Sequence, residues 1–171
     1  SSFQVHFADY DILTPGDAPN VLVAMNPAAL KANIADLPRG ATIIANSDEF
    51  TKRNLAKVGY AENPLEDESL PDAGYHLHAL PLTSMTVEAL NEFTGLTRKE
   101  KERAKNMLAL GLLSWLYSRD TESTEAFLRA KFASAPEVLA ANLAALRTGH
   151  AYGETTEDFA VRYQVAPAPM P

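Results

Sequence analysis

The stretch Asn20–Asn46, "NVLVAMNPAALKANIADLPRGATIIAN", decides the fold of this chain. The runs Asn20–Met25 and Ala41–Asn46 are almost wholly apolar, as is typical of strands that are covered on both faces. Between them, Asn26 is a suitable N-cap and Pro27 a suitable first residue of a helix, which "LPRG" then breaks. The order strand, helix, strand predicts an α/β domain with a mostly parallel sheet.

The same pattern continues on both sides of that stretch. Residues 47–59, "SDEFTKRNLAKVG", predict a capped helix that Gly59 closes, and residues 75–80, "YHLHAL", predict a third strand. Residues 63–74 are acidic and are predicted to form a solvated loop. At the amino end, "SSFQVHF" alternates apolar and polar residues, which predicts a further strand. We therefore expect a three-layer, Rossmann-like sandwich.

The rest of the chain is predicted to be helical. Two helices should begin with a capping box, in which a Ser or Thr and a Glu three residues later satisfy each other's backbone N–H groups: Thr97 with Glu100, and Ser134 with Glu137. The predicted helices lie at 84–93, from 98 onward, at 121–132 and from 138 to Gly149.

The long helix contains an unusual run, "KNMLALGLLSWLY", at residues 105–117. Gly111 should cost about 1 kcal/mol relative to alanine inside a helix. Either a neighbouring helix or strand packs very close to it, or something binds there. Asn106 follows Lys105 at the boundary between the polar and the apolar half, where its amide could bond a neighbouring subunit, a backbone group or a ligand.

Polar residues also follow the first two buried strands. Asn26 follows one strand, and Asn46, Ser47 and Asp48 follow the next. In open parallel sheets, ligands bind in the crevice outside the carboxyl ends of the strands. Because Asn and Ser are also the commonest helix caps, these four residues are candidates for either role.

Composition excludes several classes of function. The chain has 171 residues, enough for about one domain, and a formal net charge of −7, which argues against a nucleic-acid partner. It has no cysteine and therefore no thiolate ligand for a metal or cluster. No apolar run is long enough to span a bilayer, so we expect a cytoplasmic protein without a membrane partner. His76 and His78 share one face of a predicted strand, but no third metal ligand is specified.

Three segments together resemble a known family: residues 20–60, "RAKNMLALGLLSWLYSR" at 103–119 and "NLAALRTGHAYGETTEDF" at 142–159. They look like the gamma-type domain of the 2-oxoacid:ferredoxin oxidoreductases, and most closely like the N-terminal part of the alpha subunit of the 2-oxoglutarate enzymes. The resemblance implies a gamma-type domain over residues 1–166 that lacks the family's first strand and Gly-rich loop. Residues 167–171 would be an Ala/Pro linker towards a thiamine-binding domain.

The resemblance also implies a reaction, the oxidative decarboxylation of 2-oxoglutarate with coenzyme A to succinyl-CoA and CO₂, with ferredoxin as acceptor. Thiamine diphosphate, Mg and a 4Fe-4S cluster would belong to other domains or to a beta subunit, in a dimer of heterodimers. This domain would hold no catalytic residue; it would assemble the complex and line the approach of coenzyme A. Two alternatives remain: a non-catalytic α/β binding module, and a metal-dependent hydrolase built on His76 and His78.

Overall fold

The structure is a computed structural model that describes residues 4–13, 16, 18–159 and 161–166. Within these residues the chain forms two compact units, one extending up to Pro81 and the other comprising Leu82–Val165. Among the described residues, no helix has the length and apolar character needed to cross a membrane.

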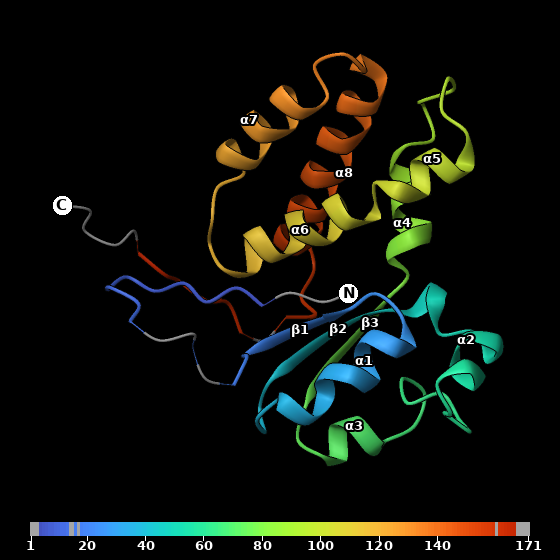
Figure 1. Ribbon diagram of the computed structural model, residues 1–171, viewed down its shortest axis with the longest axis vertical. Helices are drawn as coiled ribbons and strands as arrows, with labels where there is room; N and C mark the ends of the chain where they lie inside the picture. The colour runs from blue at the N-terminus through green and yellow to red at the C-terminus, as the bar shows by residue number, and fades with distance from the viewer. Residues whose placement is uncertain (1–3, 14–15, 17, 160, 167–171) are drawn as a thin grey trace. The chain divides into compact units, whose positions relative to one another are not determined.

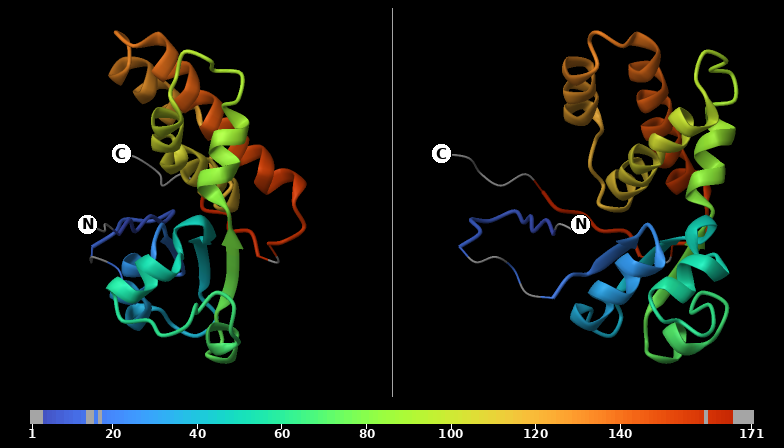
Figure 2. Two further views of the ribbon diagram at one scale, coloured as in Figure 1. Left: turned by 90° about the vertical axis from the view of Figure 1, so that its right-hand side faces the viewer. Right: turned by 45° about the vertical axis from the view of Figure 1, so that its right-hand side comes forward.

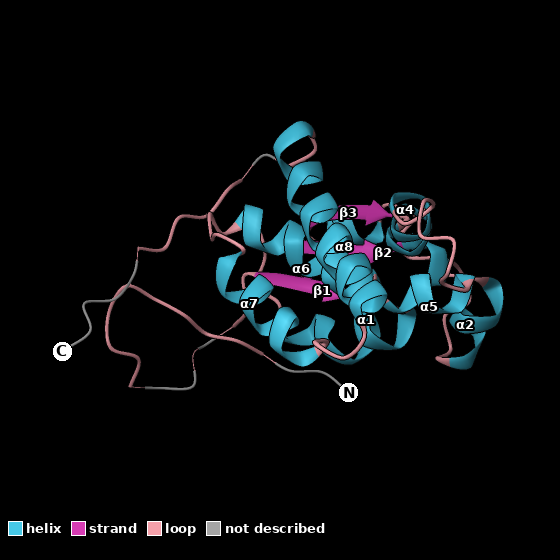
Figure 3. Ribbon diagram, turned by 90° about the horizontal axis from the view of Figure 1, so that it is seen from above, coloured by secondary structure: helices cyan, strands magenta, loops and turns pink. Residues whose placement is uncertain are grey.

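The first unit is built on a parallel sheet. Its strands are β1 (Val21–Ala24), β2 (Thr42–Asn46) and β3 (His76–Leu80), in the order β1-β2-β3. Figure 3 shows the three arrows pointing the same way. Ile43 at the centre of the sheet lies opposite Leu22 on one side and Leu77 on the other. The predicted α/β class with a parallel sheet is confirmed.

Short helices cover one face of this sheet (Figure 1). Leu30, Leu55 and Leu70 come from three different helices and pack into one core with Ile43 and Ala45 of β2. Because side chains alternate along a strand, Thr42, Ile44 and Asn46 point to the opposite face. The helical segments are α1 (Pro27–Asn33), η1 (Ile34–Asp36), η2 (Ser47–Glu49), α2 (Lys52–Lys57) and α3 (Ser69–Asp72).

The second unit is helical (Figure 2). One part of its core is formed by Leu128, Leu143 and Leu146, against which Met107 and Leu110 pack. The helices are α4 (Leu82–Ala89), α5 (Arg98–Arg103), α6 (Lys105–Leu116), α7 (Glu122–Lys131) and α8 (Pro136–Thr155).

The strand predicted at the amino end is wrong for the part of it that the structure describes. Residues 4–8 have no strand conformation. Val5 is 63% exposed and Phe7 38% exposed. Among the described residues, no strand pairs with this segment to satisfy its backbone groups. Alternation alone therefore misled the prediction. Phe3 and the predicted linker at 167–171 lie outside the described residues.

The predicted long helix is divided at Ala104 into α5 and α6. The Ala104 N–H donates to the oxygen of Lys101, and the Ala104 oxygen accepts from Met107, both in the i to i+3 pattern of a tighter turn. Ala104 itself is 2% exposed. The change of direction lets the apolar α6 become buried while the polar α5 stays in solvent.

Several other helix boundaries differ from the prediction; for example, α4 ends at Ala89 and not at residue 93. The capping box of Ser134 and Glu137 does not form, because Pro136 takes the first helical position and Ala135 becomes the N-cap. The last helix also continues through Gly149 to Thr155. Finally, the acidic loop contains the helical turn α3, so it is not wholly irregular.

Candidate functional site

The structure brings four of the predicted site residues to one edge of the sheet. Ala24 at the end of β1 lies opposite Ala45 of β2, so the residues that follow the two strands are neighbours. Asn26 comes after β1, Asn46 is the last residue of β2, and Ser47 and Asp48 begin η2. This is the carboxyl edge of a parallel sheet, where ligands bind in open α/β folds.

At this edge Asn26 acts as a helix cap. Its Oδ1 atom accepts a hydrogen bond from the backbone N–H of Ala29 at 2.9 Å, and Pro27 occupies the first turn as predicted. The Asn26 side chain satisfies one of the donors that every helix leaves free at its start. It is exposed at the same time, so capping alone does not exclude contact with a ligand.

Asn46 differs from Asn26 because it is fully buried, at 0% exposure. Asn46 has an interaction partner within the protein, and no buried side-chain nitrogen or oxygen among the described residues lacks one. Burying an amide is favourable only when its hydrogen bonds are made. Asn46 is therefore a structural anchor at the end of β2, whereas Ser47 and Asp48 are only half-buried.

The other three candidates lie on α6 in the second unit. Lys105 and Asn106 are its first two residues. Asn106 is exposed, and its amide has no hydrogen-bond partner in the described part of the chain. An exposed amide at a fixed helix position can bind a group from outside this chain.

Gly111 is explained by the crossing of α6 and α8. A Cβ atom at Gly111 would lie 1.9 Å from the backbone oxygen of Leu146 on α8. The arrangement is reciprocal, because a Cβ at Gly149 would lie 1.9 Å from the oxygen of Leu108 on α6. The close-packing interpretation of Gly111 therefore holds, and the two helices touch backbone to backbone.

After α8 the chain turns back onto the carboxyl end of α6. The Tyr152 hydroxyl bonds to Asp158 at 3.0 Å, and Phe159 lies with its ring centre 5.9 Å from that of Trp115. Gly153 makes room for the indole, since a Cβ there would lie 2.4 Å from a Trp115 ring atom. The "GETTEDF" motif thus ends α8 and directs the chain towards α6.

The segment that follows holds α6 by its last turn; we call Phe159, Arg162 and Tyr163 the clasp. Arg162 Nε donates to the Trp115 backbone oxygen at 3.1 Å, and the guanidinium lies 5.0 Å from the centre of the indole. The Tyr163 N–H donates to the Leu116 oxygen at 2.7 Å, and its ring stacks on Tyr117 with centres 4.9 Å apart.

Two effects act on the hydroxyl of Tyr117, whose ring stacks on Tyr163 of the clasp. Burial raises the pKa of its hydroxyl to about 12, and the neighbouring Tyr163 contributes in the same direction. Sequence reasoning did not identify the clasp. The aromatic residues at 159 and 163 were the available signal, but nothing in the sequence showed that they meet α6.

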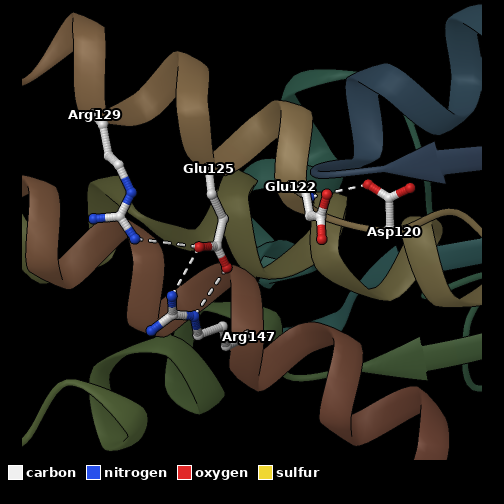
Figure 4. A network of polar contacts seen from close by, with 5 residues as sticks. All are labelled: Asp120, Glu122, Glu125, Arg129 and Arg147. Atoms are coloured by element: carbon white, nitrogen blue, oxygen red, sulfur yellow. Dashed lines mark hydrogen bonds and ion pairs between the residues drawn. The ribbon is translucent and has the colours of Figure 1, made fainter.

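An ion-pair network fixes α7 to α8 (Figure 4). Glu125 accepts from Arg147 Nε at 2.9 Å and from Arg147 Nη2 at 2.7 Å, and Arg129 adds a contact of 3.4 Å. The hydrogen bonds from Arg147, more than any other interaction, hold the pKa of the Glu125 carboxyl below its usual value. This network ties two helices together and faces solvent, so we regard it as structural.

The metal hypothesis has no support in the described residues. His76 and His78 do lie on the same face of β3, as predicted. However, no group of three or more His, Cys, Asp or Glu side chains within the described ranges could hold an ion. A zinc or iron site needs at least three protein ligands.

Comparison with known proteins identifies the family. The model of the pyruvate ferredoxin/flavodoxin oxidoreductase family matches residues 1–152. The chain belongs to this family. The 2-oxoglutarate oxidoreductase subunit KorA of Mycobacterium tuberculosis is 59% identical over 171 residues, which is 100% of this chain and 26% of KorA. The chain thus spans about a quarter of the length of this relative.

The fold agrees with that of a solved structure. A 2-oxoglutarate:ferredoxin oxidoreductase from Magnetococcus marinus, with 2-oxoglutarate, coenzyme A and succinyl-CoA bound, has a TM-score of 0.64. The match covers 93% of this chain and 24% of that chain, at 24% identity. The family model includes both groups of candidate residues and ends at Tyr152, before the clasp.

Proposed function

We propose that this chain is the gamma-type domain, residues 1–166, of a 2-oxoglutarate:ferredoxin oxidoreductase alpha subunit. The complete enzyme would work in the cytoplasm and convert 2-oxoglutarate and coenzyme A to succinyl-CoA and CO₂, while electrons pass to ferredoxin. The observation that carries the proposal is the identity of 59% to KorA over every residue of this chain. The choice of 2-oxoglutarate over another 2-oxoacid rests on that relative.

The cofactors of such an enzyme would be held by other parts of the complex. A 4Fe-4S cluster needs thiolate ligands, and this chain has no cysteine. The Mg²⁺ that accompanies thiamine diphosphate would be held by the diphosphate oxygens with one or two carboxylates, and the resemblance places that site on another domain. We therefore assign no catalytic step to the residues of this chain.

We assign this domain two roles, assembly of the complex with a beta subunit and formation of one wall of the coenzyme A approach. Asn106 supports a contact role because its amide is exposed and unpaired within the described residues. The carboxyl edge of the sheet, with Asn26, Ser47 and Asp48, supports a second contact. The partners would be the beta subunit, the rest of the alpha subunit, ferredoxin and coenzyme A, in a dimer of heterodimers.

The decisive experiment is purification of the complete tagged polypeptide from its native host. Mass spectrometry identifies the proteins that come with it, and an assay measures reduction of an artificial electron acceptor that depends on both 2-oxoglutarate and coenzyme A. A brown preparation with a beta subunit and that activity supports the proposal. A colourless, inactive preparation without such a subunit refutes it and leaves a non-catalytic binding module.

The role of Asn106 can be tested in the same complex. Asn106→Ala should raise the KM for coenzyme A without changing subunit composition if the amide lines the approach. If the amide contacts another subunit, the variant should weaken assembly instead. Asn91→Ala is the matched control, because Asn91 is also exposed and keeps the backbone oxygen that accepts from Lys101.

A further inference from the structure

The segment of α5 and the first residue of α6 is strongly basic. Residues 98–105, "RKEKERAK", contain five of the fifteen Lys and Arg residues and have a net charge of +3, in a chain whose net charge is −7. Arg98, Lys99 and Arg103 are exposed. A local concentration of positive charge in a protein of negative net charge creates a strong electric field at the surface.

Two of these cations, Lys99 and Arg103, form no ion pair with any residue that the structure describes. Arg98 forms an ion pair with Glu102 at 3.0 Å, and the carboxylate of Glu100 is engaged by Thr97 in the capping box. Lys99 and Arg103 lie four residues apart on the helix, a like-charge spacing that destabilises an isolated helix.

The same residues are held in place. Thr97 and Glu100 form a complete capping box, and Lys101 Nζ bonds to the backbone oxygen of Asn91 at 3.5 Å. The turn at Ala104 then sets α5 apart from the buried α6. The basic side chains are therefore presented on a short, fixed, convex element.

The shape of this element favours a protein partner over a small molecule. Small-molecule sites are concave and bury most of the ligand surface. A hollow found among the described residues is lined by residues between Phe50 and Asp67, and α5 does not contribute to it. A convex helix with exposed cationic ends is suited to an opposing flat or concave acidic surface.

We propose that α5, through Lys99, Lys101 and Arg103, is an electrostatic docking surface for an acidic face of the partner subunit. The inference rests on the proposed function, because it requires that a complex with a beta-type subunit exists. Opposite charges at the rim of an interface mainly accelerate association and make it sensitive to salt. The docking surface would thus steer the two subunits together.

The test uses the complete alpha polypeptide and the beta subunit, expressed together and apart. The variant Lys99→Glu/Lys101→Glu/Arg103→Glu should slow association by about tenfold or more at low salt and largely remove its salt dependence. The control Lys52→Glu/Arg53→Glu/Lys57→Glu changes the net charge equally, on the exposed residues of α2. It should stay within about threefold of the wild type, because these residues lie outside the docking surface.

A second set of variants keeps the test valid if charge reversal prevents folding. Replacement of the same three residues by glutamine should give a smaller loss of association rate in the same direction. Unchanged rate and salt dependence in both sets would overturn the proposal. A raised KM for coenzyme A with unchanged association would also overturn it and assign the surface to the phosphates of that substrate. If the wild-type subunits do not associate, the proposed function fails, which is a distinct result.

Discussion

Gly111 and Gly149 face each other's helix so closely that neither position has room for a single methyl group. Each is opposed by a backbone oxygen, of Leu146 and Leu108 respectively. Backbone atoms cannot rotate away as a flexible side chain can, so the two helices would have to separate. The close approach of α6 to α8 also lets Met107 and Leu110 pack with Leu146 in one core.

We expect Gly149→Ala to destabilise the protein by about 2 kcal/mol or more, because overpacking exceeds the gain in helix propensity. This corresponds to a fall in Tm of roughly 4–8 °C. The control is Ala140→Gly at an exposed position of the same helix, where alanine should instead be the better residue by about 1 kcal/mol. A Gly149→Ala variant as stable as the wild type would contradict the crossing geometry.

Replacement of Asn26 separates its capping role from a ligand role. Asn26→Ala should cost about 1 kcal/mol of unfolding free energy because the Ala29 N–H loses its acceptor, whereas Asn26→Ser keeps an oxygen and should be nearly neutral. Denaturant unfolding measures both. If the serine variant is stable but binds coenzyme A more weakly in the complex, the amide also contacts the ligand.

The Glu125 network should make the packing of α7 on α8 dependent on pH. The pKa of Glu125 is lower in the folded protein than in the unfolded chain. Its carboxylate therefore stabilises the fold at pH values above the ordinary glutamate pKa of about 4.3. This stabilisation is lost as the pH falls through the lowered pKa of the folded state. Glu125→Gln should therefore cost up to about 1 kcal/mol at neutral pH and nothing in strong acid.

Thermal unfolding of Glu125→Gln and of the wild type at a series of acid pH values shows whether their stabilities become equal in strong acid. Glu122→Gln, on the same helix, is the control, because its carboxylate forms no ion pair with Arg147 or Arg129. A stability difference for Glu125→Gln that stays constant into strong acid would show that lost packing, not charge, explains its effect.

The clasp can be tested through the hydroxyl of Tyr117. Tyr163→Ala removes the stacked ring and should lower the pKa of Tyr117 from about 12 towards 10, because burial is the main cause of the shift. Tyr163→Phe keeps the ring and should leave the pKa well above 10. Ultraviolet titration, with Tyr117→Phe subtracted to isolate this group, measures the pKa. Equal values for the alanine variant and the wild type would contradict the contact.

The sequence predicted the elements whose signals are local. β1 contains no polar residue, and the polar residues of β2, Thr42 and Asn46, lie only at its two ends. Asn26, Pro27 and the Thr97–Glu100 box form caps with residues that are close in sequence. Close packing was one of the two interpretations that the sequence offered for Gly111, since a glycine inside an apolar helix weakens that helix unless a neighbour needs the space. The helix that approaches could not be predicted, because nothing in the sequence pairs Gly111 with Gly149.

The errors arose where tertiary contacts override local preference. Val5 and Phe7 alternate like a strand, but a strand also needs a neighbour for its backbone groups. Gly149 fits the sequence pattern of a helix C-terminus, but it lies inside α8, where the oxygen of Leu108 leaves no room for a side chain. The clasp depends on contacts between residues 47 positions apart, as for Arg162 and Trp115, which no local pattern reveals.

The clasp also gives this protein an intrinsic optical label. Trp115 is the single tryptophan of the chain, and it is 9% exposed between Gly153, Phe159 and Arg162. Excitation at the red edge of the absorption band selects indole over the tyrosines, so emission from this chain comes from one known position. The wavelength of that emission depends on the polarity around the ring. Release of the clasp from α6 can therefore be followed in real time, without any added dye.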